Sequence, residues 1–345
     1  MAPGRHATMA EIATWAGASS SDVALVMAED PRVPPELHRR IVEVMDTAGY
    51  CALEAVQTQL GRPLQVAIVF HIGLGDGLEA NHFYSPVASA IALASADAGA
   101  KVVQGAMLVN DDRELIELPS ALRDGRCDAA FLLGAELNAE VVEGLRATGC
   151  PIILVDGYSA GDVLDSVVTD NATGARVAVE HLIAAGHRDI ALLGTQPDCY
   201  PSIRERRMGY IQAIEACGLP KHFIDINYVF EEAAAVEALG YLRRHPAVTA
   251  IFGANDWTVV AFMRSARTAG FRIPADLSLI GFDDIDLATL VSPVLTTLAV
   301  DKALMGRAAF ALMVHRMEVP TADPVRAVAI PSLVERQSVA QPRRR

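Results

Sequence analysis

The sequence predicts an α/β fold, in which a small all-α head precedes a two-lobed body of doubly wound parallel sheets. Before about residue 60, short helical patterns follow one another without a strand between them. After that point, apolar β-rich runs alternate with helical patterns, which is typical of parallel βα units. The chain is large enough for this plan, because 345 residues of which 52% are hydrophobic can fill more than one core.

The head begins with the pattern of two short helices joined by a tight turn. Thr8 and Glu11 fit a capping box, Thr-x-x-Glu, which predicts the start of the first helix. Ser19 and Asp22 fit a second box and predict the start of the next helix. Gly17 allows the turn between them, so this stretch predicts a helix-turn-helix.

A third helix and a small core complete the predicted head. The stretch "PPELHRRIVEVMDTAGY", residues 34–50, predicts a helix that ends at Gly49. Apolar residues at helical spacing form a miniature core consisting of Ile12, Ala13, Val23, Val26, Leu37, Ile41 and Val44.

The body is predicted from buried strands that alternate with helices. The strands are expected at 66–70, 101–104, 129–133, 152–155, 190–194, 250–253 and 277–282. The clearer helices are expected at 85–99, 171–186, 204–218, 233–245 and 258–270, and four of them are closed by a glycine. Two doubly wound lobes built this way face each other across a cleft, and ligands bind in such crevices at the carboxyl ends of parallel strands.

Composition indicates a cytoplasmic protein without a membrane span. The sequence lacks a secretory signal pattern and an apolar run of the roughly 20 residues that a spanning helix needs. The cysteines are odd in number and never form a CxxC pair, which favours reduced thiols and argues against a zinc site; they are Cys51, Cys127, Cys150, Cys199 and Cys217. We expect no metal and no cofactor.

Enzyme chemistry has little support in the sequence. The run "HIGLGDG" after the first body strand lacks the third glycine of a dinucleotide-binding loop, and a flexible loop is the better interpretation. The phosphate-binding loop and the nucleophile elbow patterns are absent from the sequence. His181 and His187 are six residues apart, which does not place them on one helix face as metal ligands.

Four segments of the body resemble the effector-binding region of the LacI/GalR family of bacterial transcription regulators. In order, they are "VVTDNATGARVAVEHLIAAGHRDIALLG", "SIRERRMGYIQAI", "IFGANDWTVVAFMRSARTAGFRIPADLSLIGFDD" and "LTTLAVDKALMGRAAFALM". With the head, the resemblance covers nearly the whole chain. It implies a body like that of periplasmic sugar-binding proteins, a homodimer, and a head that binds operator DNA.

The resemblance also suggests domain boundaries. We expect a helix-turn-helix head over 1–50, a hinge or linker over 51–64 and an effector-binding body over 65–340. The body is expected to divide into lobe 1, at about 65–160 and 295–322, and lobe 2, at about 161–294 and 323–340.

Polar residues follow several predicted strands, where a ligand would bind. Asp156, Asn255 and Asp283 each lie at the carboxyl end of a strand, and Arg206 lies on a helix. A guanidinium donates and carboxylates accept hydrogen bonds, so this set suits a hydroxyl-rich effector such as a sugar or nucleoside. By resemblance, these four residues match family positions that contact effectors. The alternative for Asn255 is a turn residue, and for Asp283 it is a helix cap.

Aromatic residues near the same strand ends are further candidates for effector binding. Trp257 follows Asn255 closely, while Phe83 and Tyr84 precede the first helix of the body. Flat rings bury a large area against a sugar face or a base. Packing of Trp257 inside the second lobe is the alternative. The family's polar or aromatic position after "LTTL" is here Ala299 or Val300, which leaves the ligand open.

The head departs from the DNA-reading pattern of the family. In the second helix, Asp22, Ala24, Leu25 and Ala28 replace the family's Thr, Ser, Arg and Asn. The remaining candidates for DNA contacts are Thr8, Ser19, Ser20, Ser21 and Arg32. Residues 1–60 carry four basic and eight acidic side chains, a net charge of −4 that disfavours docking on phosphates.

The hinge departs as well. The stretch "YCALEAVQTQL" has Gln57 in place of the family's Arg, and the hinge Leu is displaced to Leu60. Inserting that Leu between base steps costs unstacking energy, which phosphate contacts normally offset, so this offset is weakened here.

Two functions follow from these observations. The first is a ligand-responsive, DNA-binding transcription regulator, in the form of a repressor, that senses a sugar- or nucleoside-like effector. The second is a cytoplasmic dimer that binds a small molecule and has a degenerate head that no longer reads DNA. An enzyme is a remote third interpretation.

Overall fold

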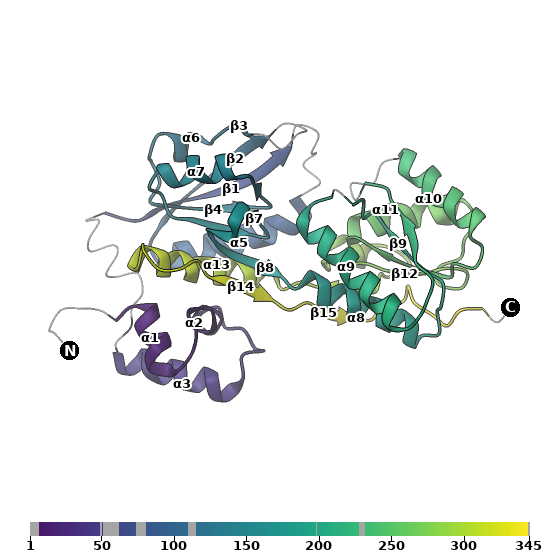
Figure 1. Ribbon diagram of the computed structural model, residues 1–345, viewed down its shortest axis with the longest axis horizontal. Helices are drawn as coiled ribbons and strands as arrows, with labels where there is room; N and C mark the ends of the chain where they lie inside the picture. The colour runs from purple at the N-terminus through teal and green to yellow at the C-terminus, as the bar shows by residue number, and fades with distance from the viewer. Residues whose placement is uncertain are drawn as a thin grey trace. The chain divides into compact units, whose positions relative to one another are not determined.

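The computed structural model describes residues 7–48, 50, 62–73, 81–109, 115–197, 199–227 and 232–343. These residues belong to two compact units (Figure 1). The first unit comprises residues 1–168 and 301–329, and the second unit comprises residues 169–300 and 330–345. No helix in the described ranges is long and apolar enough to cross a membrane. The hinge residues 51–61, Gly49 and the loop residues 74–80 lie outside the described part of the chain.

Three helices form the head at the start of the first unit. They are α1 (Met9–Ala16), α2 (Ser20–Met27) and α3 (Pro35–Ala48). Gly17 has a φ of 61°, which a glycine adopts without strain, and it makes the turn between α1 and α2. The predicted core is present, with Ile12, Ala13, Val23, Val26 and Ile41 buried and Leu37 and Val44 half-buried.

A twisted sheet forms the centre of the first unit. Among the described residues it has seven strands in the order β14-β8-β6-β4-β1-β2-β3. The pairs from β8 through β2 are parallel, and β3 is antiparallel to β2. The strands are β1 (Gln65–Gly73), β2 (Lys101–Val109), β3 (Leu115–Glu117), β4 (Ala129–Leu133), β6 (Ile152–Val155), β8 (Asp165–Thr169) and β14 (Arg326–Ala329). A separate short pair joins β5 (Glu136–Leu137) to β7 (Tyr158–Ser159).

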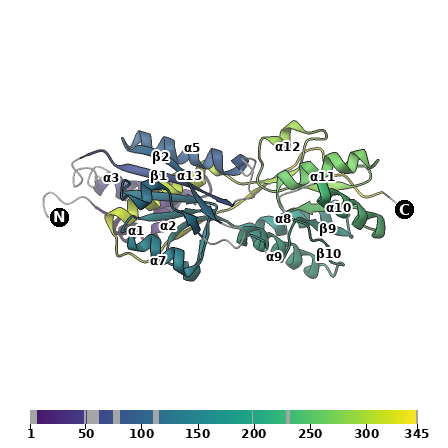
Figure 2. The same ribbon diagram turned by 90° about the horizontal axis from the view of Figure 1, so that it is seen from above.

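Helices cover both faces of this sheet, as Figure 2 shows. On one face lie α5 (Asn81–Asp97) and α13 (Lys302–Glu318), and on the other lies α7 (Ala139–Ala147). The short α6 (Ser120–Arg123) contributes to the same core as α7, and a 3-10 turn spans Ala160–Asp162. Gly306 lets α13 approach α5, because a Cβ there would lie 2.6 Å from the Cβ of Ala90.

The second unit is built on a smaller parallel sheet. Its order is β10-β9-β11-β12, formed by β9 (Ile190–Leu193), β10 (His222–Ile224), β11 (Ala250–Gly253) and β12 (Ser278–Ile280). A separate antiparallel pair in the same unit consists of β13 (Thr297–Ala299) and β15 (Ser332–Val334).

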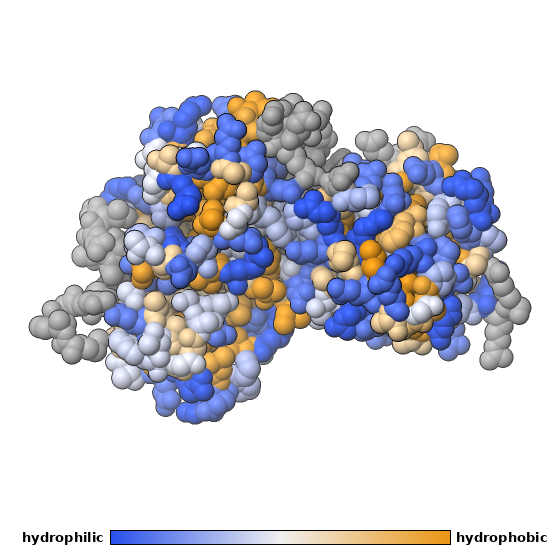
Figure 3. Space-filling model, viewed as in Figure 1, coloured by the Kyte–Doolittle hydropathy of each residue, from blue (hydrophilic) through white to orange (hydrophobic). Residues whose placement is uncertain are grey.

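Four long helices surround this sheet. They are α8 (Asn171–Ala184), α9 (Pro201–Ala216), α10 (Glu232–Arg244) and α11 (Asp256–Thr268), with a short α12 at Leu287–Leu290. The core between the sheet and α10 and α11 contains Leu193, Ile251, Phe262 and Leu279. Outer faces of these helices are polar, so the side of the second unit seen in Figure 3 is largely hydrophilic.

All seven predicted body strands coincide with strands of the structure, and the α/β class is confirmed. The expected lobe boundaries differ from the observed units. Residues 161–168 and 323–329 belong to the first unit because they contain β8 and β14, which extend its sheet, while 295–300 belong to the second unit. The pattern did not predict β8 or β14, because β8 begins with two polar residues, Asp165 and Ser166, and β14 has only four residues, the first of which is Arg326.

Candidate functional site

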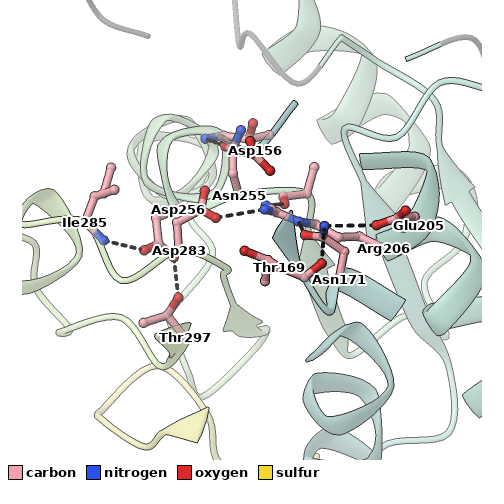
Figure 4. A network of polar contacts seen from close by, with 12 residues as sticks. Asp156, Thr169, Asn171, Glu205, Arg206, Asn255, Asp256, Asp283, Ile285 and Thr297 are labelled. Atoms are coloured by element: carbon pink, nitrogen blue, oxygen red, sulfur yellow. Dashed lines mark hydrogen bonds and ion pairs between the residues drawn. The ribbon is translucent and has the colours of Figure 1, made fainter. Parts of the chain in front are cut away.

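Arg206 is the centre of a buried polar network in the second unit (Figure 4). It lies on α9 and is only 3% exposed. Its Nε donates to Asn171 Oδ1 at 2.9 Å, one Nη to the carbonyl of Ala254 at 2.6 Å, and the other Nη to Asp283 Oδ1 at 2.9 Å. The guanidinium is therefore held in one orientation by three elements of the unit.

The loop after β12 positions Asp283 against this guanidinium. Asp283 has a φ of 105°, a backbone conformation that non-glycine residues rarely adopt. Its N–H donates to the carbonyl of Leu298 at 2.8 Å. The ring of the preceding Phe282 lies under the guanidinium of Arg206, 3.8 Å from Cζ to the ring centroid. Strained backbone held by surrounding contacts is typical of ligand-binding sites.

Asp256 lies beside this pair and is fully buried. Its Oδ1 accepts from the hydroxyl of Thr297 at 2.6 Å, and its Oδ2 accepts from the N–H of Ile285 at 3.0 Å. Burial, together with the charge of Asp283, raises the pKa of Asp256 to about 8. A neutral Asp256 supports the loop that carries Asp283 without adding a second negative charge next to it.

Two further predicted residues lie at the start of α11. The side chain of Asn255 caps this helix, since its Oδ1 accepts from the N–H of Thr258 at 2.8 Å. The alternative to effector binding that the sequence offered for Asn255 was a turn residue, and the structure shows it as a helix cap instead. Trp257 is half-buried at the second position of the helix.

Asn171 is a functional candidate that sequence reasoning missed. Its Oδ1 accepts from Arg206, and its Nδ2 donates to Glu205 Oε2 and to the carbonyl of Thr169, both at 3.0 Å. Asn171 is the first residue of α8 and is separated from the end of β8 by Asp170 alone, so it too lies near the end of a strand. Recognising "DSVVT" as a strand would have identified it.

The predicted residues of the first unit lie together. The hydroxyl of Tyr84 donates to Asp156 Oδ2 at 2.9 Å. Asp156 is 5% exposed, has a φ of 46° and directly follows β6. Tyr84 meets the ring of Phe83 edge to face at 5.2 Å, and the ammonium of Lys302 lies 5.6 Å from the Phe83 centroid. Gly134 leaves room for Tyr84, because a Cβ there would lie 2.6 Å from the tyrosine oxygen.

In the head, both predicted capping boxes are confirmed. Thr8 Oγ1 accepts from the N–H of Glu11 at 3.3 Å, while Glu11 Oε2 accepts from the N–H of Thr8 at 2.9 Å. Ser19 and Asp22 make the same reciprocal pair, at 3.1 and 2.8 Å. The oxygens of Thr8 and Ser19 are thus engaged in starting helices.

The other candidates for DNA contacts have mixed surroundings. Ser20 and Ser21 are half-buried in the first turn of α2. Arg32 forms a two-pronged pair with Asp30, with Nε to Oδ1 at 2.9 Å and Nη to Oδ2 at 3.0 Å. Although burial opposes it, these hydrogen bonds from Arg32 hold the pKa of Asp30 below its ordinary value. The charge of Arg32 is therefore largely neutralised within the head.

Comparison with known proteins extends these observations. Residues 179–339 match the family model described as a periplasmic binding protein-like domain. The ribose operon repressor of Escherichia coli (strain K12) is 28% identical over 339 residues, covering 96% of this chain and 99% of the repressor. A solved complex of the transcriptional regulator CelR with cellobiose is 27% identical, with a TM-score of 0.67, covering 96% of this chain and all of that one.

The chain is also similar in fold to a repressor that has been solved in complex with DNA. A lac repressor dimer bound to operator has a TM-score of 0.64 and covers 97% of this chain and all of that one. At 21% identity, this similarity shows the fold of the head and the body together.

Proposed function

We propose that the chain is a transcriptional regulator of the LacI family that represses transcription in response to a sugar- or nucleoside-like effector. Its relatives are regulators rather than enzymes. The main support for the proposal is the Arg206 network. Three hydrogen bonds fix the orientation of the guanidinium, so its N–H donors and the carboxylate of Asp283 have defined positions for a ligand. We place its action in the cytoplasm, as a homodimer on operator DNA.

The chemistry of the network favours a ligand with adjacent hydroxyls. A hydroxyl both donates and accepts, so neighbouring hydroxyls can accept from Arg206 and donate to Asp283. The guanidinium has five N–H donors, of which the three described bonds use one each, and the pairing with Asp283 keeps the net charge of the site low. A neutral polyol suits such a site better than a second anion or cation does.

The amide of Asn255 and the pair of Tyr84 and Asp156 are proposed as additional contacts. The cap of α11 uses the oxygen of Asn255, and its Nδ2 is the donor proposed for a ligand. Tyr84 and Phe83 offer ring surface of the kind that packs on sugar faces, with Asp156 as an acceptor beside them. We propose Trp257 as a further ring contact.

A thermal-shift screen tests the effector proposal. Sugars, nucleosides and their phosphates are added to the full chain, since a ligand that binds the native state raises the melting temperature. For the hit, Asp283→Asn and Tyr84→Phe are expected to weaken binding about tenfold or more, since the first replaces a charged acceptor by a neutral amide and the second removes a hydroxyl. Arg176→Ala, which removes an exposed partner of Glu180 on α8, is the control and leaves the affinity unchanged. Unchanged affinity in Asp283→Asn would show that the site is misplaced.

A second function has specific support in the head. Thr8 and Ser19 are engaged in helix caps and Arg32 in an ion pair, which agrees with a head that no longer reads DNA. The two functions are separated by titrating the full chain with genomic fragments, including its own promoter, across a salt series. The regulator predicts that at least one fragment outcompetes bulk DNA. Equal affinity for all fragments even at low salt would leave the small-molecule-binding dimer.

A further inference from the structure

The second helix of the head, α2, is more buried than packing against α1 and α3 alone would make it. Every residue of α2 is buried or half-buried, whereas half of the residues of α3 in the same head are exposed. Val23 and Val26 belong to the core of the head. Ala24 and Ala28 lie four residues apart on another side of the helix, and both have no exposed surface.

The cover on the outer side comes from α13 and β14 of the body. Both elements lie next to α2, and Figure 1 shows the head beneath them. The guanidinium of Arg307, in the middle of α13, donates through Nε to the carbonyl of Ala28 at 2.6 Å. The end of α2 is therefore bonded to a residue 279 positions away in the chain.

A second attachment joins the start of α1 to the end of α13. Glu318 Oε2 accepts from the N–H of Met9 at 3.0 Å and from the hydroxyl of Tyr50 at 3.4 Å. A carboxyl group at a helix N-terminus also interacts favourably with the helix dipole. Glu318 is half-buried where the head meets α13, and this burial raises its pKa to about 7.

The residues of α2 agree with this contact better than with a DNA surface. Where the family has Ser and Asn, the chain has Ala24 and Ala28, which are small and apolar, and Leu25 stands where the family has Arg. Small apolar side chains allow helices to approach closely. Long polar ones at the same positions would have to be buried without partners.

We propose that α13 is a docking surface for the head, that docking covers the DNA-reading side of α2, and that the head must leave α13 before it binds DNA. The inference rests on the proposed DNA-binding function and adds its regulation. A recognition helix enters the major groove with the side that faces away from the head's core. Because α13 and β14 occupy that side, docking and DNA binding exclude each other. The docked fraction then lowers the apparent affinity for DNA.

Hydrogen exchange of the full chain tests docking without DNA or effector. The variants are Arg307→Ala and Glu318→Ala, which change α13 and leave the head's residues intact, and Arg264→Ala, on the exposed side of α11, is the charge-matched control. We expect amides of α2 to exchange about tenfold faster in either α13 variant and unchanged in the control. Protection around Ile41 in α3 is expected to persist, because an undocked head stays folded. Circular dichroism shows whether each variant is folded. If one of the two α13 variants fails to fold, the other still tests docking.

DNA titration of the same proteins at low salt tests the consequence. We expect the α13 variants to bind DNA about tenfold more tightly than the wild type. Unchanged exchange in α2, or loss of protection at Ile41 together with α2, would overturn docking. Faster exchange in α2 without tighter DNA binding would overturn the competition. If none of the proteins binds DNA, the proposed function fails and the competition with it, while the exchange data still decide whether the head docks.

Discussion

The buried carboxyl of Asp256 should make the stability of the second unit depend on pH. Its pKa is about 8 in the folded protein, against 3.8 for an unperturbed aspartate. Between these values the folded state keeps a proton that the unfolded state releases, so the free energy of unfolding falls as pH rises. Stability from this group is fully present below pH 3.8 and is lost as pH rises through about 8.

The magnitude follows from the size of the shift. One proton changes the free energy of unfolding by about 1.4 kcal/mol per pH unit, so this group alone lowers it by roughly 3 kcal/mol between pH 5 and pH 7. Asp256→Asn keeps the shape of the neutral acid and has nothing to titrate. As pH rises, the free energy of unfolding of the wild type should therefore fall relative to that of the variant.

Urea unfolding at pH 5, 6, 7 and 8 measures this difference. The chain has two tryptophans, and a Trp15→Phe background leaves Trp257, next to the substituted residue, as the fluorescent reporter of the second unit. Groups that do not interact with Asp256 titrate equally in both proteins and cancel in the comparison. Parallel stability curves for wild type and Asp256→Asn would refute the assignment, as would a wild-type curve that rises relative to the variant.

Four further substitutions test local structure by urea unfolding. Leu279→Ala removes a fully buried side chain from the core of the second unit and is expected to lower stability by about 2–5 kcal/mol; a loss below 1 kcal/mol would contradict the packing. Gly281→Ala places a Cβ 2.0 Å from Asp256 Oδ1 and should destabilise, whereas Gly144→Ala, in open space on α7, should stabilise by about 0.5–1 kcal/mol; the reverse order would be contrary to the structure. Ser19→Ala breaks the capping box of α2 and should cost about 1 kcal/mol, with no change expected if the box does not form.

The parts of the fold that sequence predicted are those with a local cause. The capping boxes of α1 and α2 join residues three apart, and the central strands are continuous apolar runs such as Ala129–Leu133. By contrast, β8 begins with Asp165 and Ser166, whose burial comes from neighbouring segments, so its sequence does not read as a buried strand. Asn171 was missed for the same reason.

The candidate site shows the same division. Asp156, Arg206 and Asp283 were predicted from strand ends and from resemblance, and Arg206 and Asp283 proved to be bonded partners. The support of that pair by Asp256 was not predicted, since it depends on Thr297 and Ile285, which follow it by 41 and 29 residues. Contact between Arg307 and Ala28 has no local pattern at all.

A regulator of the proposed kind couples effector binding to DNA binding, and a single titration measures this coupling. The full chain is titrated with its preferred genomic fragment, with and without a saturating amount of the ligand found by thermal shift. We expect the ligand to change the dissociation constant for that fragment by about 5- to 150-fold, the usual range for coupling between two sites. A ligand that raises the melting temperature and leaves the DNA affinity unchanged would contradict this expectation.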